Sequence, residues 1–561
     1  MPSIHVQNFG GIVPRISDRL LPQSAATVAE NCKLWSGEIR PFRAPRVDPS
    51  PVKDGFVETI HNINGLWLSW NGDVDVARGF IPGDTTGRIY YTGDGKPKIT
   101  NVSLASSSPP YPSQAYDLGV AAPTAHPALN VGVGGTGTVT TREYLYTFVT
   151  TFDEEGPPSD PSPSVDVLDG QVVSLSGFAA PTSQNIDRIR VYRSTTGTST
   201  TEFLFVGDMP VGQATFVDTV VGVDLGERLP SQQWYPPPPN MAGLVSHPNG
   251  FLAGFTGNQL YVSEPYQPHA YAPENVKVFD YAIVALGVYG NTIVVATSGF
   301  TYLVSGSNPQ NLSVDKLPDP YPCVSKRSMA SGDRGVIYAS SSGLVWVGFG
   351  GLELITRAEV TRDEWAAYAP NTIHGVVYDG HYYGYYLFDK GQDYTLVDPV
   401  GAGFVFDYAD RATGVDSRSK LTSLTGYATA THVDVGSGLY YIQRGNRRNT
   451  LLQAERGVGL IPYRWRSKAF VTPYLTSFGA VKVVARHVQR GDLPTGRTVK
   501  FTLFVGKEAK YSRAVKANEP FRLPRFYREV EPWYLQVEGD VDVYDIHMAT
   551  SMEELKEGGG Q

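Results

Sequence analysis

At residues 379–386 the chain reads Asp379-Gly380-His381-Tyr382-Tyr383-Gly384-Tyr385-Tyr386, a turn followed by residues with high strand propensity. The same unit recurs along the chain, with turn glycines at Gly250, Gly290, Gly335 and Gly438. The successive spacings from Gly250 to Gly438 are 40, 45, 45 and 58 residues. A period of about 40–50 residues with several strands per repeat is typical of propeller blades. We therefore predict a β-propeller-like domain over 240–455, with an irregular β-domain as the alternative.

The segment 1–125 is predicted to be a β-rich N-terminal platform region. Its strands within 65–92 could join the propeller, because a propeller closes by pairing the two ends of its series of sheets. One helix is expected at Ser24–Leu34, where Ser24 can cap the first turn. The residues at helical spacing in this segment are Ala25, Val28, Ala29 and Cys32.

A separate β-sandwich is predicted over 126–235. Short strand-like runs, beginning with Tyr144–Thr150, alternate there with turn clusters. The phrase YTFVTTFDEEGPPSDPS followed by IDRIRVYRS resembles a fibronectin type III module. Four prolines at 236–239 predict a stiff boundary. The segment 456–561 is predicted to be a C-terminal β-rich platform region, with a short helical turn at Ser551–Lys556.

The composition of the 561-residue chain agrees with this organisation. Its length predicts about three to five domains. The chain contains 59 Gly and 41 Pro, 12% aromatic residues and only 18% charged residues. Many turns, many aromatics and few charges indicate a mainly β, multidomain protein. The net charge of -8 excludes a chain-wide basic surface for gripping nucleic acid.

Targeting and redox signals are sparse. The two cysteines, Cys32 and Cys323, form no disulfide framework and no cysteine-based zinc site, and we expect two buried or idle thiols. No basic segment followed by an apolar one opens the sequence, and no run of 18 apolar residues occurs. We therefore expect a soluble protein without a membrane-spanning segment, made in a cytoplasm and carrying no recognisable N-terminal export signal.

No motif predicts catalysis, a cofactor or a metal, so we expect no catalytic, cofactor-binding or metal-binding residues. The sequence lacks the zinc-helix, serine-elbow and phosphate-loop motifs. Gly83-Asp84-Thr85-Thr86-Gly87 only faintly resembles an aspartic-protease triplet, and a turn in which Asp84 binds nearby amides is favoured. Asp73 and Asp75 lack the later ligands of a calcium loop and are expected in a hairpin turn. Arg490-Gly491-Asp492 is expected to be a loop.

Two further groups of residues were considered as sites. His374 and His381 are seven residues apart in a strand region, which would place them on opposite faces of one strand and so predicts no metal site. The basic clusters are Arg444 with Arg447 and Arg448, and Arg464 with Arg466 and Lys468. Each could touch phosphates, but a charged turn and a charged strand face are favoured.

The order of segments resembles one protein family. The opening VQNFGGIVPRISDRLLPQSAATVAENCKLWSGEIRPFR and the later GFIPGDTTGRIYYTGDGKPKIT resemble the tail nozzle proteins of short-tailed bacteriophages, also called tail tubular protein B. The closing YRWRSKAFVTPYLTSFGAVKV and VYDIHMATSMEEL fit the same order. The chain is shorter than the longest family members, which leaves their peripheral inserts in doubt here.

The resemblance implies a structural virion protein with no enzymatic activity. Such proteins form a sixfold ring at the distal end of the tail, below the adaptor of the head-tail connector, and next to tail fibres or spikes. They retain the packaged genomic DNA and let it pass without sequence specificity. The alternatives are a glycan-binding or adhesive β-propeller protein and a carbohydrate-active enzyme, which could use two carboxylates that no motif reveals.

Overall fold

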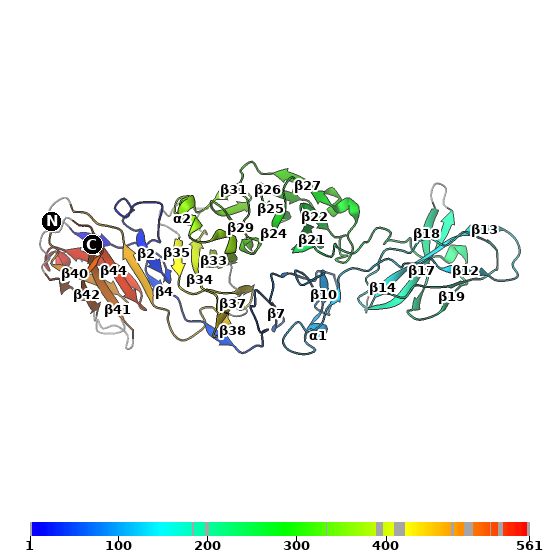
Figure 1. Cartoon of the computed structure of the whole chain (residues 1–561), viewed down its shortest axis with the longest axis horizontal. Helices are drawn as coiled ribbons and strands as arrows, with labels where there is room; N and C mark the ends of the chain where they lie inside the picture. The colour runs from blue at the N-terminus through cyan, green and yellow to red at the C-terminus, as the bar shows by residue number, and fades with distance from the viewer. Residues whose placement is uncertain are drawn as a thin grey trace. The chain divides into compact units, whose positions relative to one another are not determined.

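The computed structural model describes residues 3–181, 185–196, 201–332, 334–388, 397–408, 421–472, 476–486, 497–515, 518–524 and 531–557. Strands make up 48% of the chain and helices 5%, which confirms the mainly β, multidomain class (Figure 1). The chain forms two compact units that interleave in sequence. Unit 1 contains 1–71, 296–301 and 317–561, and unit 2 contains 72–295 and 302–316.

The two ends of the chain build one β-sandwich in unit 1. One layer has the order β1-β45-β40-β43, in which β1 (Ile4–Val6) pairs antiparallel with β45 (Val543–Ala549). The other layer contains β2 (Ala26–Glu30) beside β39 (Tyr463–Ser467). Alternate side chains of both layers fill a core of aromatic and branched residues that includes Trp465, Trp533 and Phe501. The remaining strands of these two layers are β40 (Ala480–Ala485), β43 (Phe521–Arg522), β44 (Trp533–Gly539), β41 (Val499–Val505) and β42 (Glu508–Val515).

The helix expected at Ser24–Leu34 is wrong, because this segment forms β2 and then β3 (Cys32–Lys33). A register shift between Ala26 and Val28 interrupts the pairing of β2 with β39. Asn31 then takes a positive φ of 52°. These two irregularities bury Ala26, Ala29 and Cys32, three residues apart. A bulged strand therefore produced the spacing that suggested a helix.

Unit 1 also contains a series of blade-like antiparallel sheets. They are β28-β29-β30-β31, then β32-β33-β34-β35, then β36-β37-β38 with β5, and the hairpin β6-β7. The second of them is not a separate sheet, because β35 pairs with β2 and so joins β32–β35 to β39, β44, β41 and β42 in one nine-stranded sheet. The first strands pack in series, since β28 contacts β32, β32 contacts β36, and β36 contacts β6. The strand β5 comes from the N-terminal segment and completes a sheet formed almost 400 residues later. The bounds are β5 (Arg46–Asp48), β6 (Thr59–Ile63), β7 (Leu66–Trp70), β28 (Ala330–Gly332), β29 (Gly335–Ser340), β30 (Gly343–Gly348), β31 (Gly351–Leu354), β32 (His374–Tyr378), β33 (His381–Leu387), β34 (Gly401–Asp407), β35 (Leu421–Leu424), β36 (Ala430–Asp434), β37 (Gly438–Gly445) and β38 (Arg448–Gln453).

Unit 2 contains three more four-stranded sheets of the same kind and a sandwich. The sheets are β8-β9-β10-β11, β20-β21-β22-β23 and β24-β25-β26-β27, and β20 contacts both β8 and β24. This recurrence in the two units makes the fold β-propeller-like. Their bounds are β8 (Asp75–Arg78), β9 (Ile89–Thr92), β10 (Lys98–Thr100), β11 (Tyr116–Asp117), β20 (Ala242–His247), β21 (Phe251–Thr256), β22 (Gln259–Val262), β23 (Lys277–Val278), β24 (Ile283–Tyr289), β25 (Thr292–Thr297), β26 (Thr301–Ser305) and β27 (Ser313–Lys316).

The sandwich of unit 2 is formed by short antiparallel strands between 128 and 218. Its sheets are β12-β16-β19, β13-β15 and β14-β17-β18. Their apolar side chains meet in one core around Tyr146, Val173 and Val191. The sandwich lies in the segment predicted to hold one, 126–235, and its likeness to a fibronectin type III module stays a prediction. The strands are β12 (Ala128–Val131), β13 (Val139–Arg142), β14 (Tyr144–Thr150), β15 (Val165–Leu168), β16 (Val173–Ser176), β17 (Ile186–Thr196), β18 (Thr201–Pro210) and β19 (Thr215–Asp218).

Helices are short throughout the described part of the chain, and none of them is long and apolar enough to cross a membrane. A helix α3 (Glu554–Glu557) overlaps the helical turn expected at Ser551–Lys556 and ends one residue beyond it. The glycines of the closing tail, 558–561, lie outside the described residues. The division of the sequence into the segments 1–125, 126–235, 240–455 and 456–561 stays a prediction, because the two compact units divide the chain at other residues.

Candidate functional site

Asp84 forms the predicted turn. Its Oδ1 accepts from the Thr86 amide at 3.1 Å and from the Thr86 hydroxyl at 2.7 Å, and its Oδ2 accepts from the Arg88 amide at 3.3 Å. Burial would raise the pKa of Asp84, but these bonds and the Arg88 guanidinium hold that pKa below its ordinary value. The carboxylate is therefore committed to local structure.

Asp73 and Asp75 do not lie in a hairpin turn, so that expectation is wrong. The strand before them, β7, pairs with β6, whereas β8 after them pairs with β9. The segment is therefore a link between two sheets. Asp75 Oδ2 accepts from the Gly243 amide at 2.8 Å, which ties β8 to the start of β20. Among the described residues, no group of three His, Cys, Asp or Glu side chains could hold a metal ion.

His374 and His381 lie on two neighbouring strands, so the parity argument from a single strand is wrong. A turn at Asp379 and Gly380, both with positive φ, connects β32 to β33. His374 stacks on Tyr385, and its burial lowers its pKa well below the ordinary value. His381 packs against Trp35, with Asp407 at 3.9 Å. The two imidazole rings therefore have different neighbours.

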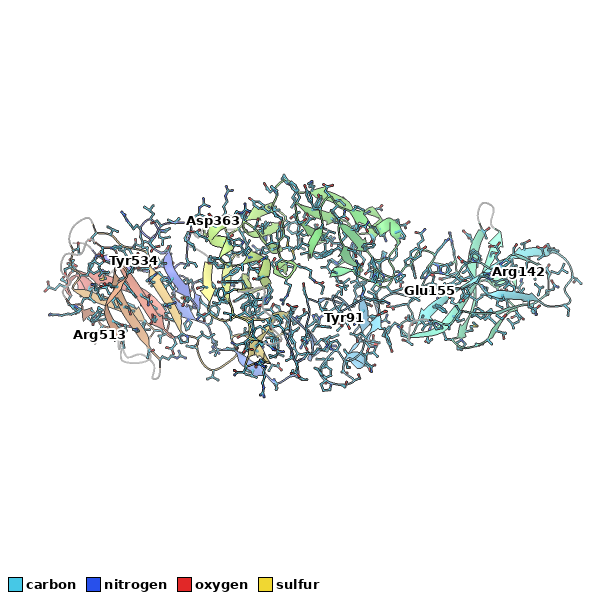
Figure 2. The ribbon with its side chains drawn as sticks, in the orientation of Figure 1. Tyr91, Arg142, Glu155, Asp363, Arg513 and Tyr534 are labelled. Carbon is cyan, nitrogen blue, oxygen red and sulfur yellow. The ribbon has the colours of Figure 1, made fainter. Side chains whose placement is uncertain are left out.

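The basic strand β39 is engaged by its own chain. Arg464 forms a two-pronged pair with Glu30, Arg466 donates to Thr27 Oγ1 at 2.9 Å, and Lys468 donates to the Leu21 carbonyl. Arg466 also lies over the ring of Tyr534, which Figure 2 labels. A charged strand face is confirmed, and each of these three side chains has at least one acceptor within the chain.

The second basic cluster contains one buried arginine and two exposed ones. Arg444 is buried and donates to the Gly55 carbonyl. Arg447 and Arg448 are exposed at the β37–β38 turn, where Asn446 and Arg447 have positive φ. This cluster therefore offers two free cations at most. The tripeptide Arg490-Gly491-Asp492 lies outside the described residues.

Both cysteines are buried, as predicted. Burial raises the pKa of Cys323 to about 12 and moves the pKa of Cys32 upward as well. Burial therefore favours the neutral thiol at both positions.

Two buried polar networks stabilise the sandwich (Figure 2). In one, Glu155 Oε1 accepts from Thr147 at 2.8 Å, Tyr192 at 2.7 Å and Ser231 at 3.2 Å, and Oε2 faces Arg190 at 3.0 Å. In the other, Asp218 binds Tyr144 and Arg193, with Arg142 at 3.9 Å. Each carboxylate has its partners within the sandwich, so these networks are structural.

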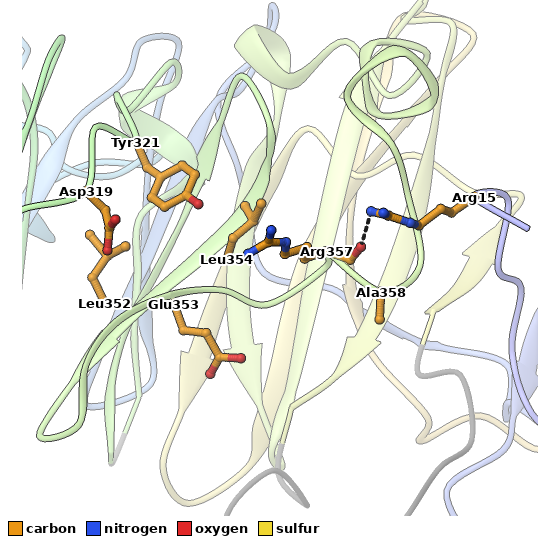
Figure 3. Close-up of a pocket in the computed structure, with 8 residues that line it drawn as sticks. All are labelled: Arg15, Asp319, Tyr321, Leu352, Glu353, Leu354, Arg357 and Ala358. Atoms are coloured by element: carbon orange, nitrogen blue, oxygen red, sulfur yellow. Dashed lines mark hydrogen bonds between the residues drawn. The ribbon is translucent and has the colours of Figure 1, made fainter.

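An open polar pocket of about 580 Å³ lies beside the loop that follows β31 (Figure 3). Two arginines, Arg15 and Arg357, and two acids, Asp319 and Glu353, line it. Arg15 Nη1 donates to the Arg357 carbonyl at 2.9 Å, which fixes the N-terminal segment against this loop. The mixed charges give the pocket no preference for one sign of ligand.

A second cavity, of about 230 Å³, has five tyrosines among the 17 residues that line it. Tyr383 and Tyr385 project from the same face of β33, and Tyr441 projects from β37. Glu455 lies at its edge with a positive φ of 55°. No motif search could find this cavity, although the alternating tyrosines after the turn glycines were a visible signal.

Comparisons with known proteins leave the family open. No protein-family model matches the chain, and no curated protein matches it. Among solved structures, the N-terminal domain of Nup159 is 8% identical, with a TM-score of 0.27, and the match covers 62% of this chain and 86% of that one. AztD from Citrobacter koseri is 11% identical, with a TM-score of 0.23 and coverage of 71% and 99%. At these scores the likenesses carry no argument.

Proposed function

We propose that this chain is a ring-forming tail nozzle protein of a short-tailed bacteriophage virion. In this role it retains the packaged DNA and forms the channel through which the DNA enters the host. Its partners are further copies of itself, the tail adaptor, tail fibres or spikes, and the passing DNA.

The observation that carries the proposal concerns the family-like stretches at the two ends of the chain. The opening stretch, 6–43, supplies the last residue of β1 and all of β2, and the closing stretches supply β39, most of β40 and β45. These strands pair with one another, as in Val6 with Ile546 and Glu30 with Arg464. Stretches that resemble the nozzle family at opposite ends of the sequence thus belong to one domain, which supports their reading as a common platform.

Electrostatics also support a channel that lets DNA slide. The chain carries a net charge of -8, so a ring of copies is acidic as a whole and does not trap a polyanion. Most cations of the basic strand β39 are already paired or hydrogen-bonded within the chain. Any contact with phosphates is therefore weak and brief.

Electron microscopy of the purified full chain, alone and with the tail adaptor, tests the proposal. We expect a ring with an axial channel wide enough for a duplex. A chain that stays monomeric with the adaptor, or a ring closed to DNA in every state, would contradict the assignment. A filter-binding assay adds a second check: binding to duplex DNA should be weak, independent of sequence and steeply reduced by salt.

A further inference from the structure

The tyrosine-lined cavity of unit 1 lies between two neighbouring blade-like sheets. One wall is β33, which contributes Tyr383 and Tyr385, and the opposite wall is β37, which contributes Leu439 and Tyr441. The N-terminal segment adds Phe42, and the residues after β38 add Glu455. Three parts of the chain that are distant in sequence thus enclose one space.

Several polar atoms at this cavity have no protein partner. Within the described part of the chain, the hydroxyls of Tyr383, Tyr385 and Tyr441 make no hydrogen bond, and the buried Oε1 of Glu455 accepts none. Burial raises the pKa of Tyr441 to about 12, so this hydroxyl stays protonated and can donate. Of these atoms only Glu455 Oε1 is buried, and a buried polar atom without a partner is costly. The three tyrosine hydroxyls are not closed off by protein atoms, so they can bond to an occupant of the cavity.

Glu455 is also held in an unusual backbone conformation. Its φ of 55° lies in the left-handed region, which costs a residue with a side chain free energy. Its other carboxylate oxygen, Oε2, pairs with Lys33. This pairing directs one oxygen to Lys33 and leaves the other without a protein partner.

The charge around the cavity selects a neutral occupant. Lys33 balances Glu455, and Arg43 adds a positive charge to the lining, so an organic cation is disfavoured despite the aromatic rings. An anion gains little either, because the charge of Lys33 is already paired with Glu455 and the exposed Arg43 is screened by solvent. The volume of about 230 Å³ is below the ~300–1,000 Å³ of pockets for drug-sized ligands, so the occupant is a single ring.

We propose that this cavity binds one neutral polyhydroxylated ring, the chemistry of a monosaccharide unit. Its C–H faces pack on the tyrosine rings, while its hydroxyls bond to the free tyrosine hydroxyls and donate to Glu455 Oε1. This inference does not rest on the nozzle proposal, because it concerns a site within one chain.

Saturation-transfer NMR and calorimetry on the full chain test the site. The probes are D-glucose, D-galactose, D-mannose and N-acetylglucosamine, with tetramethylammonium and phosphate as charged alternatives. We expect saturable one-to-one binding of at least one sugar. Glu455→Gln and Tyr385→Phe each remove one hydrogen-bonding group, and Ala454→Met fills the space; each should weaken binding about tenfold or more.

A matched control is Tyr261→Phe, which removes a hydroxyl bonded to Gln259 in unit 2 and should leave sugar binding unchanged. Circular dichroism and thermal melting show whether each variant is folded. If Ala454→Met is not folded, the result for Glu455→Gln, the most conservative change, decides the test. Absence of saturable sugar binding overturns the proposal. Preferential binding of tetramethylammonium or phosphate, or sugar binding unaffected by every cavity variant, overturns it equally.

Discussion

Arg193 donates from Nη1 to Asp218 Oδ2 across 2.7 Å in the sandwich, and the two side chains are only 3% and 0% exposed. Asp218 Oδ2 also accepts from the Tyr144 hydroxyl, and Oδ1 accepts from the Val220 amide. The carboxylate thus joins three separate strands and a loop in a dry environment. Such a pair is sensitive to the loss of one partner because the remaining charge stays buried.

The first prediction concerns this pair. Asp218→Asn should lower the free energy of unfolding of the sandwich by about 3–5 kcal/mol, because Arg193 loses its counter-charge while it remains buried. Urea unfolding followed by fluorescence measures the change. The double variant Asp218→Leu with Arg193→Met should recover part of the loss, since it removes the fully buried Arg193 charge and leaves only Arg142, 3.9 Å from Asp218, without its partner. A loss below about 1 kcal/mol in Asp218→Asn would show that the pair is solvated.

The second prediction concerns Glu154. Burial raises its pKa from 4.5 to about 7, although the Arg88 guanidinium opposes the shift. Because the folded-state pKa is the higher one, its contribution to stability is full below pH 4.5 and is lost as the pH rises through about 7. Glu154→Gln should therefore stabilise unit 2 at pH 8 by up to about 3 kcal/mol and have no such effect at pH 4.

Thermal unfolding of both proteins from pH 4 to pH 8 measures this difference. Comparison with the parent chain is needed because of the buried His269. Burial lowers the pKa of His269 to about 4, so its effect on stability over pH 4 to 8 has the opposite sign to that of Glu154. The control Glu227→Gln replaces an exposed carboxylate of the same unit and should leave the pH profile unchanged. A Glu154→Gln profile parallel to that of the parent would contradict the shift.

The third prediction separates free cations from engaged ones. Arg447 and Arg448 are exposed at the β37–β38 turn, whereas Arg464 is paired with Glu30. If the chain touches duplex phosphates through that turn, Arg447→Ala with Arg448→Ala should reduce the slope of log binding constant against log salt by about two. Arg464→Ala should change this slope by less than one. The reverse order would place the DNA contact on β39 instead.

The fold class was predictable because the repeated turn and strand unit reflects how each blade is built. The segment Ser24–Leu34 was not predictable in the same way. Its burial period of three comes from a register shift after Ala26 and from the positive φ of Asn31, and both depend on pairing with β39. Strand pairing across more than 400 residues overrode the local helical pattern.

The candidate cavity was even less accessible to sequence reasoning. Tyr385 and Tyr441 are adjacent only because β33 and β37 belong to neighbouring sheets, and Phe42 comes from the N-terminal segment. Nothing in the spacing of these residues encodes their meeting. The stretch after Gly380 did predict that alternate side chains point to opposite faces of the strand. Tyr383 and Tyr385 lie on one face, and Tyr382 lies on the other, where its hydroxyl donates to the Ser328 carbonyl.

The last prediction compares two tryptophans in the core of the terminal sandwich. Trp465 on β39 and Trp533 on the adjacent β44 are both 0% exposed. The Trp465 indole donates to the Gly10 carbonyl at 3.0 Å and meets Phe9 edge to face, whereas the Trp533 indole nitrogen has no acceptor among the described residues. Trp465→Phe therefore removes a hydrogen bond and leaves a buried carbonyl unpaired, while Trp533→Phe removes a donor that was already unpaired.

Both variants lose similar packing volume, so Trp465→Phe should lower the free energy of unfolding in urea by about 1–3 kcal/mol more than Trp533→Phe does. Equal losses would mean that water or another acceptor satisfies both indoles, and a larger loss in Trp533→Phe would contradict the role of Gly10 in holding the N-terminal segment to the last strands.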